Sequence, residues 1–422
     1  MRILDRLRNL YSGWWVLFGV TLLGVMSGGI LYHGAAVFFN PIRRDLNLSS
    51  ANTSLIFTLS RAQSSLAAPL YGWLVDRLGP RPLIVIGTIV ASVGLVTITL
   101  IDNYILFLLA YVLLVSVPSQ FGFGPTLMAA ANGWFVRRKA IAMTILLTGI
   151  AAGGAIFLYP LGLGVATKGW RSTLIYSAIF VLASGLLCSR LVRSPPDQVD
   201  EIEQFTPTAP DTPSGSDASY DFSLSEALRK GVFWILLAAS TLRISAETGL
   251  SIHIIPIMVW QGAEEEFAAG LVAIFFLLSI PFRFSLGMAG HRLSFQPLIA
   301  MGMFAGVAGC ALLIFSDSVS SLYPFVVLLA VYEGAVVLQW IAIGNYFGRR
   351  NYGAITGIMR AFDAVGSLFA PLYAGWMFDR TDSYVPALGA FAAAFAIAAL
   401  LYTISRRPHR NETALDSGGV RY

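Results

Sequence analysis

The segment GWLVDRLGPRP, residues 72–82, has a counterpart in the second half of the chain, GMAGHRLSFQP, residues 287–297. The two share Gly, Arg, Leu and Pro at an offset of 215 residues (287 minus 72). Two further pairs have nearly the same offset. WFVRRKAIAMT from Trp134 matches YFGRRNYGAIT from Tyr346, and Trp14, Gly29 and His33 match Trp234, Gly249 and His253. Three matches at nearly one offset predict two copies of one fold.

Composition places both copies in a membrane. Of the 422 residues 56% are hydrophobic and only 12% are charged, about half the charged fraction of an average soluble protein. The surplus apolar surface must face lipid, so the partner we expect is the bilayer. The net charge of +5 resides in short loops between apolar segments, which is typical of membrane topology and does not indicate nucleic acid binding. Cys188 and Cys310 lie in apolar runs, so we expect no disulfide framework.

Twelve segments approach or exceed the ~20 apolar residues that a membrane span needs. They run over 14–40, 52–76, 82–101, 104–134, 138–166, 169–192, 231–262, 265–292, 296–316, 319–347, 351–379 and 383–405. The predicted organisation is an N-terminal six-helix bundle (1–193), a mostly disordered acidic linker (194–229), a C-terminal six-helix bundle (230–405) and a tail (406–422). Ser223 and Glu226 form a capping-box pattern, which predicts a short surface helix before the seventh span.

The distribution of Lys and Arg predicts that both termini are cytoplasmic. The predicted outer loops hold only Arg43, Arg44, Lys168, Arg171 and Arg380. We therefore expect a multi-pass protein of the cell membrane, inner or plasma. The first span is too long for a signal peptide and should be retained. Four arginines fall inside spans: Arg61, Arg243, Arg283 and Arg360.

A loop motif identifies a family resemblance. The pattern formed by Gly72, Asp76, Arg77, Gly79 and Arg81 resembles the loop 2–3 signature of the major facilitator superfamily. With the repeat and twelve spans, the resemblance covers essentially the whole chain. It implies an all-α integral membrane fold of twelve transmembrane helices in two pseudo-symmetric bundles, with substrate bound between them. The acid and arginines of the motif would latch the cytoplasmic ends, and Gly72 would permit close packing. In the second copy His291 replaces the acid.

A narrower resemblance concerns substrate. The first span, GWWVLFGVTLLGVMSGGILYHGAAVFF (13–39), resembles that of monocarboxylate transporters, and WFVRRKAIAMTILLTGIAAGG and YFGRRNYGAITG are similar to loops of that family and of oxalate–formate antiporters. These families carry an eighth-span arginine that binds the substrate carboxylate, and Arg283 occupies that position. An ungapped match places His33 at a first-span lysine that takes part in proton coupling in animal monocarboxylate transporters.

Two departures bear on the substrate. Ser279 stands where monocarboxylate transporters have an aspartate, four residues before the arginine. Asp363 falls at the position of a lysine in the eleventh span of the oxalate antiporters, with Arg360 one turn earlier. Because an acid, Asp363, stands at the position of the second cation, we expect a substrate with a single carboxylate in preference to oxalate.

Arg283 lies within LLSIPFRFSLGMAG, residues 277–290. A lone cation in hydrocarbon costs at least ~2.5–3.5 kcal/mol, so it requires a partner, a wet cavity or a function. We favour binding of a substrate carboxylate, which suits a planar guanidinium. The alternative is a structural salt bridge to Asp363 or Glu333.

Several side chains are candidates for carrying a proton. His33 and His253 occupy symmetry-related positions, and histidine exchanges protons near neutral pH; each is alternatively a neutral histidine bonded to a neighbouring helix. Glu333 has no partner within its own helix, so it is either a proton site or a buried neutral acid. Glu247 follows Arg243 by four residues and Asp363 follows Arg360 by three, so internal ion pairs are favoured there and proton transfer is the minor alternative.

The remaining polar residues support weaker predictions. Tyr32 and Tyr332 are candidates for hydrogen bonds to substrate, although such residues more often join helices. Ser279 and His253 are also candidate substrate-binding residues. Arg61 is assigned a structural role, because it has no sequence-local partner. The glycine-rich stretch TGIAAGGAIF (148–157) is interpreted as a packing surface.

The function predicted is secondary active transport of a small monocarboxylate or similar organic anion, with a proton, by alternating access, in a monomeric unit without metal or cofactor. The alternatives are an antiporter of other organic anions or drugs without proton coupling and, less favoured, a non-transporting receptor. An enzyme is not expected, since the sequence contains no H-E-x-x-H, G-x-S-x-G or P-loop motif.

Overall fold

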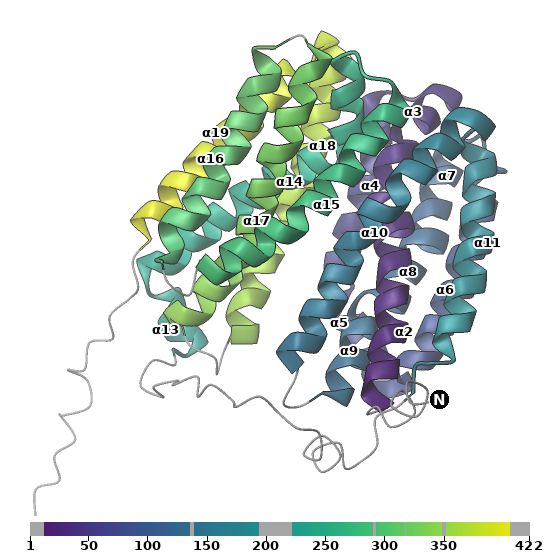
Figure 1. Cartoon of the computed structure of the whole chain (residues 1–422), viewed down its shortest axis with the longest axis horizontal. Coiled ribbons are helices and arrows are strands. Elements are labelled where there is room, and N and C mark those ends of the chain that lie inside the picture. Colours follow the sequence, from purple (N-terminus) through teal and green to yellow (C-terminus); the bar gives the residue numbers. More distant parts are fainter. Residues whose placement is uncertain are drawn as a thin grey trace, which may run out of the picture.

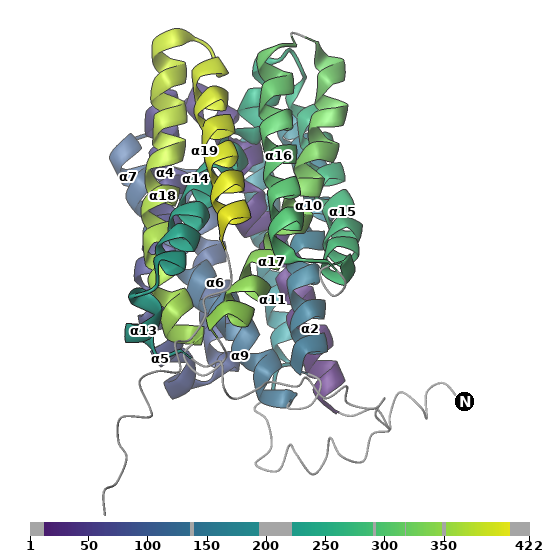
Figure 2. The same ribbon diagram turned by 90° about the vertical axis from the view of Figure 1, so that its left-hand side faces the viewer.

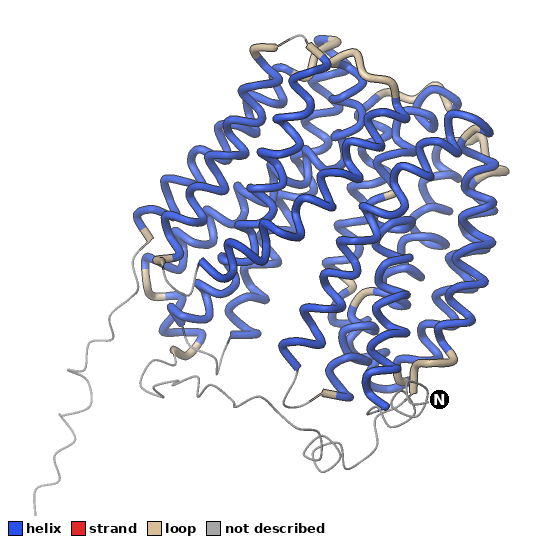
Figure 3. The backbone as a smooth tube through the Cα atoms, in the orientation of Figure 1, coloured by secondary structure: helices blue, strands red, loops and turns tan. Residues whose placement is uncertain are grey.

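The computed structural model describes residues 12–135, 139–193, 222–289, 293–316, 318–347 and 352–405. Within these ranges the secondary structure is helical, without strands, as Figure 3 shows. Among the described residues, eleven segments are long and apolar enough to cross a membrane. The helices of the two halves of the chain lie side by side (Figure 1).

The helices of the first half follow the predicted segments. The first segment contains α2 (Ser12–Met26), the π-helical η1 (Ser27–His33) and α3 (Ala35–Asp45). The second contains α4 (Ser50–Leu66) and α5 (Ala68–Leu78), and the third is α6 (Pro80–Ile98). The fourth contains α7 (Tyr104–Ala110), η2 (Tyr111–Ser116), α8 (Val117–Phe123) and α9 (Pro125–Trp134), and it is followed by α10 (Lys139–Lys168) and α11 (Trp170–Ser189).

The second half begins with the short helix α13 (Leu224–Leu228), whose predicted capping box is present. Ser223 Oγ accepts from Glu226 N, and Ser223 N donates to the Glu226 carboxylate. The long helices that follow are α14 (Gly231–Trp260), α15 (Glu265–Ala289), α16 (Phe295–Ile314), α17 (Leu322–Phe347), α18 (Tyr352–Thr381) and α19 (Val385–Ile404), with the short 3-10 helix η4 (Val319–Ser321) before α17.

The segment 52–76 is the one expected span that is missing from the eleven apolar candidates. It is folded as α4 and α5, two helices of 17 and 11 residues that meet at Ala67. Its sequence carries Asn52, Arg61 and Gln63, which lower its hydropathy. These polar residues are tolerated because α4 packs against α18 of the other half and turns part of its surface to the interior.

The glycine-rich stretch of α10 allows the first span to approach it closely, as predicted. A Cβ atom on Gly153 would lie 2.1 Å from the carbonyl oxygen of Val25, and one on Gly28 would lie 2.1 Å from that of Ile150. Only glycine permits these backbones to touch. This contact fixes η1, which carries Tyr32 and His33, against α10.

The two halves are joined tightly at one end. We call the end where α5, α9 and α13 lie the linker end (Figure 2) and the opposite end the far end. At the far end the Asp379 carboxylate of α18 accepts hydrogen bonds from the backbone N of Ser50 (2.6 Å) and of Ala51 (2.8 Å), at the first turn of α4. Arg44, at the end of α3, pairs with Glu265 of α15 at 2.8 Å. The far end is therefore closed.

At the linker end the ribbons of the two halves diverge (Figure 1). A Cβ atom on Gly72 would meet nothing within 4 Å, and Arg77 stacks on the ring of Trp73 at 5.2 Å. In the described ranges Arg77 and Arg81 form no salt bridge. Gly79 has φ +77°, which suits a tight turn between α5 and α6. The Asp76 side chain and His291 lie outside what the structure describes, so the predicted latch stays a prediction.

Candidate functional site

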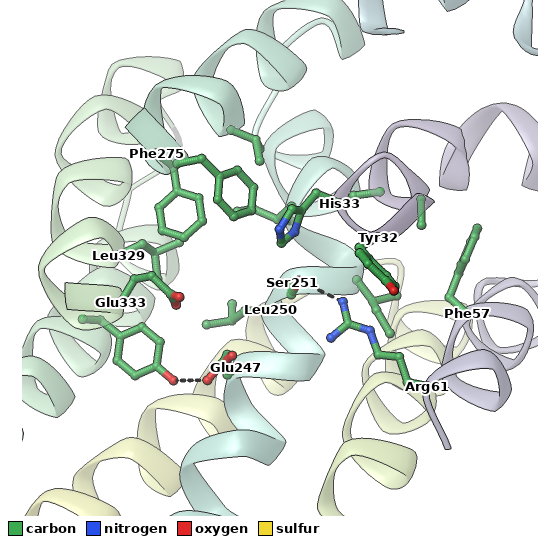
Figure 4. Close-up of a pocket in the computed structure, with 17 residues that line it drawn as sticks. Tyr32, His33, Phe57, Arg61, Glu247, Leu250, Ser251, Phe275, Leu329 and Glu333 are labelled. Carbon is green, nitrogen blue, oxygen red and sulfur yellow. Dashed lines mark hydrogen bonds between the residues drawn. The ribbon is translucent and has the colours of Figure 1, made fainter. Parts of the chain in front are cut away.

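A cavity of about 130 Å³ lies between the two halves. Its walls come from η1, α3 and α4 of the first half and from α14, α15 and α17 of the second, as Figure 4 shows. Much of the wall is apolar and includes Phe275, Phe276 and Leu329. The polar side chains in the wall are Tyr32, His33, Arg61, Glu247, Ser251, Tyr332 and Glu333.

His33 and Tyr32 reach the cavity from η1. The His33 ring packs on that of Phe276 from α15, with ring centroids 4.1 Å apart. Tyr32 Oη donates to the Ser119 carbonyl oxygen at 3.3 Å. His33, which aligns with the first-span lysine of animal monocarboxylate transporters, therefore lies where the two halves meet.

Arg61 also belongs to the cavity wall. It extends from α4 towards α14, where its Nη2 donates to Ser251 Oγ at 3.3 Å (Figure 4). From the sequence Arg61 was predicted to have a structural role, because it has no sequence-local partner. The sequence feature that could have pointed to the cavity is a guanidinium in the middle of a predicted span, since such a charge needs a partner, a wet cavity or a function.

The predicted ion pair between Arg243 and Glu247 is present and extends into a network. Arg243 Nη1 donates to Glu247, and its Nε donates to Gln339 Oε1 at 2.8 Å. Tyr332 Oη donates to Glu247 Oε2 at 2.8 Å. Arg243 is only 2% exposed whereas Glu247 is 28% exposed, so the carboxylate is the part of the pair that meets the cavity.

Arg283 of α15 forms a salt bridge with Glu333 of α17, one of the two structural partners considered for it. Glu333 lines the cavity, and Arg283 pairs with it at the cavity's edge. The Nε of Arg283 is buried and has no acceptor among the described residues. A buried donor without an acceptor is costly, so this guanidinium has capacity for a further acceptor.

Besides Arg283, three predicted residues lie outside the cavity wall. Asp363 accepts from Ser240 Oγ at 2.9 Å. Ser279 Oγ donates to the carbonyl oxygen of Phe276 at 2.7 Å, within its own helix. His253 is buried where α14 meets α4, with its Nε2 2.8 Å from Ser54 Oγ and its Nδ1 3.0 Å from Tyr384 Oη. These contacts suit helix packing, and the substrate and proton roles of the three residues stay predictions.

Comparisons with known proteins concern the chain as a whole. The family model described as Major Facilitator Superfamily matches residues 16–343. Monocarboxylate transporter 12 of Xenopus laevis is 23% identical over 423 residues, which cover 94% of this chain and 90% of that protein. Monocarboxylate transporter 4 of Gallus gallus is 25% identical over 394 residues, 88% of this chain and 78% of that protein.

A solved structure shares the fold. A bacterial homolog of the human lysosomal transporter Spinster, in an inward-facing and unoccupied conformation, superposes with a TM-score of 0.72. Its sequence is 17% identical, and the match covers 94% of this chain and 97% of that one.

Proposed function

The chain belongs to the major facilitator superfamily and is a transmembrane transporter, and we propose that it carries a small monocarboxylate or similar organic anion together with a proton. The observation that carries this proposal is the salt bridge between Arg283 and Glu333 at the edge of the cavity between the bundles. The Glu333 carboxylate occupies the position on the Arg283 guanidinium that a substrate carboxylate would take.

Exchange of one carboxylate for another couples the anion to a proton. When a substrate carboxylate binds Arg283, Glu333 loses its cation in apolar surroundings, which disfavour its charged form. Glu333 then takes up a proton. The cation, the anion and the neutral acid can reorient together at a lower cost than a buried unmatched charge. His33 in the cavity wall is the alternative proton carrier.

The arrangement of the bundles supports alternating access. The far end is closed by the hydrogen bond that Asp379 of α18 accepts at the first turn of α4 and by the pair of Arg44 with Glu265. We assign the linker end to the cytoplasm, with both termini there, in the inner or plasma membrane. The cavity is built from both halves of one chain, so a monomer is a complete transport unit.

The test is uptake of labelled acetate, lactate, pyruvate and oxalate into proteoliposomes, with and without an inward proton gradient. We expect a monocarboxylate to accumulate with the gradient and to alkalinise the outer medium. Accumulation without movement of protons would support the antiport alternative. Failure of every carboxylate to move would refute the proposed substrate class and leave the family assignment intact.

A further inference from the structure

We infer that Arg61 is a second contact for the substrate carboxylate, supplied by the first bundle. The anion would then be held between guanidinium groups of both bundles, Arg61 on α4 and Arg283 on α15. The inference rests on the proposed function, and it concerns a residue to which the family resemblance assigns no role.

The position of Arg61 is the first support. Its side chain lies in the cavity wall and extends from the first half to Ser251 of the second (Figure 4). The contact of 3.3 Å is slightly longer than the usual range for an N–H···O hydrogen bond. Exchange of the neutral Ser251 hydroxyl for a carboxylate would replace a bond in which only the donor is charged by one in which both partners are charged.

The second support is the division of contacts between the bundles. Arg283 and Glu333 both belong to the second half, on α15 and α17. A ligand bound only there would favour neither arrangement of the bundles, because a ligand shifts a conformational equilibrium only by its differential affinity for the two states. A contact from α4 makes the affinity depend on how the halves are placed.

The chemistry of the remaining wall defines the class of ligand. Phe275, Phe276 and Val272 of α15 and Leu329 of α17 contribute apolar side chains to the cavity wall. The cavity of about 130 Å³ far exceeds the ~10–15 Å³ that one water needs. The fitting ligand is a monocarboxylate with an apolar body, its carboxylate towards the two arginines.

Calorimetry on the purified full-length protein tests the inference. It measures the binding of phenylacetate, of its uncharged analogue phenylacetamide, and of acetate. We expect wild type to prefer phenylacetate over both others. Arg61→Gln should weaken phenylacetate binding about 10- to 100-fold, the range for loss of a hydrogen bond to a charged group, and leave phenylacetamide binding unchanged. Arg61→Lys should retain part of the preference for the acid.

Two further variants separate binding from structure. Ser251→Ala removes one contact of Arg61 with the other half, and Arg190→Gln removes an exposed arginine at the end of α11. Arg190→Gln should bind phenylacetate as wild type does, and Ser251→Ala should keep the preference for phenylacetate over phenylacetamide. If Ser251→Ala and Arg61→Gln weaken acid and amide equally and lower the melting temperature together, Arg61 only holds the halves in contact and the inference is wrong.

The outcomes also separate this inference from the proposed function. If Arg61→Gln binds phenylacetate like wild type while Arg283→Ala does not, Arg61 is no substrate contact and the proposed function stands. If wild type binds and transports no carboxylate at all, the proposed function fails and the inference fails with it.

Discussion

Glu333 reaches from α17 to the guanidinium of Arg283 on α15, while its own helix offers it no ionic partner. Sequence reasoning identified both residues as exceptional, because charged groups inside spans require an explanation. It could not decide between Glu333 and Asp363 as the partner, since that choice depends on which helices adjoin. In the structure Asp363 is instead hydrogen-bonded to Ser240.

We predict that Glu333→Gln uncouples transport from protons. Glutamine keeps the shape and can still accept a hydrogen bond from Arg283, but it cannot take up a proton at neutral pH. The ratio of the uptake rate with an inward proton gradient to the rate without it should fall close to one. Exchange of labelled for unlabelled substrate should continue. Proteoliposome assays measure both rates.

Glu264→Gln, at an exposed position before α15, is the matched control and should keep the stimulation by the gradient. If the Glu333→Gln protein still accumulates substrate with the gradient, the proton carrier is His33 or another group and not Glu333.

At the scale of the helix, two contacts position the cavity. One is the contact of η1 and α2 with α10 through glycines, which the composition of residues 148–157 predicted. The other is the cap that Asp379 places on α4. The second was not predicted, although a signal exists: the pattern Gly-Trp-x-x-Asp-Arg occurs both at 72–77 and at 375–380.

We predict that Gly153→Val destabilises the protein. Its Cβ would overlap the Val25 carbonyl, and overpacking typically costs ~1–3 kcal/mol. The melting temperature in detergent should fall. Gly389→Val in α19 is the control, because a Cβ there meets nothing within 4 Å. Equal melting temperatures for the two variants would contradict the close contact.

We predict that Asp379→Asn loosens the far end. The neutral amide loses the charge-assisted bonds to Ser50 N and Ala51 N, and an anion no longer faces the positive end of α4. A cysteine at Ala35, a residue of the cavity wall, reports opening of the far end. In a background with Cys188 and Cys310 replaced by alanine, an impermeant maleimide applied from the far side should label it several-fold faster in Asp379→Asn.

Asp382→Asn, three residues further on, is the control for that experiment and should leave the labelling rate unchanged. Faster labelling from the linker side alone would show that Asp379 does not hold the far end closed.

For the whole molecule, the sequence predicted most of the architecture because apolar runs and the internal repeat are strong signals in lipid. The helical segments fall close to the expected boundaries, including the polar second one that forms α4 and α5. The conformational state was beyond prediction. Which end is closed depends on contacts between the halves, such as that of Arg44 with Glu265. The proposed alternating access requires the sequence to permit both arrangements.

The site residues could be predicted where a polar or charged residue falls inside an otherwise apolar span. His33, Tyr32, Glu247, Tyr332 and Glu333 were all selected from the sequence, and the structure brings them to one cavity. His253 and Ser279 were selected on symmetry and on alignment, and they lie outside its wall. The position of Arg61 in the wall was not predicted, because its neighbour Ser251 is 190 residues away in the chain.

The most direct test of carboxylate transport through Arg283 is counterflow. Proteoliposomes loaded with an unlabelled monocarboxylate are mixed with the labelled compound outside, without a proton gradient, for wild type, Arg283→Lys and Arg283→Ala. We predict transient accumulation of label in wild type, reduced accumulation in Arg283→Lys, and none in Arg283→Ala. The melting temperature of the Arg283→Ala protein should equal that of wild type, which shows that it is folded. Wild-type counterflow by the correctly folded Arg283→Ala protein would contradict the role of Arg283 as the site that binds the anion.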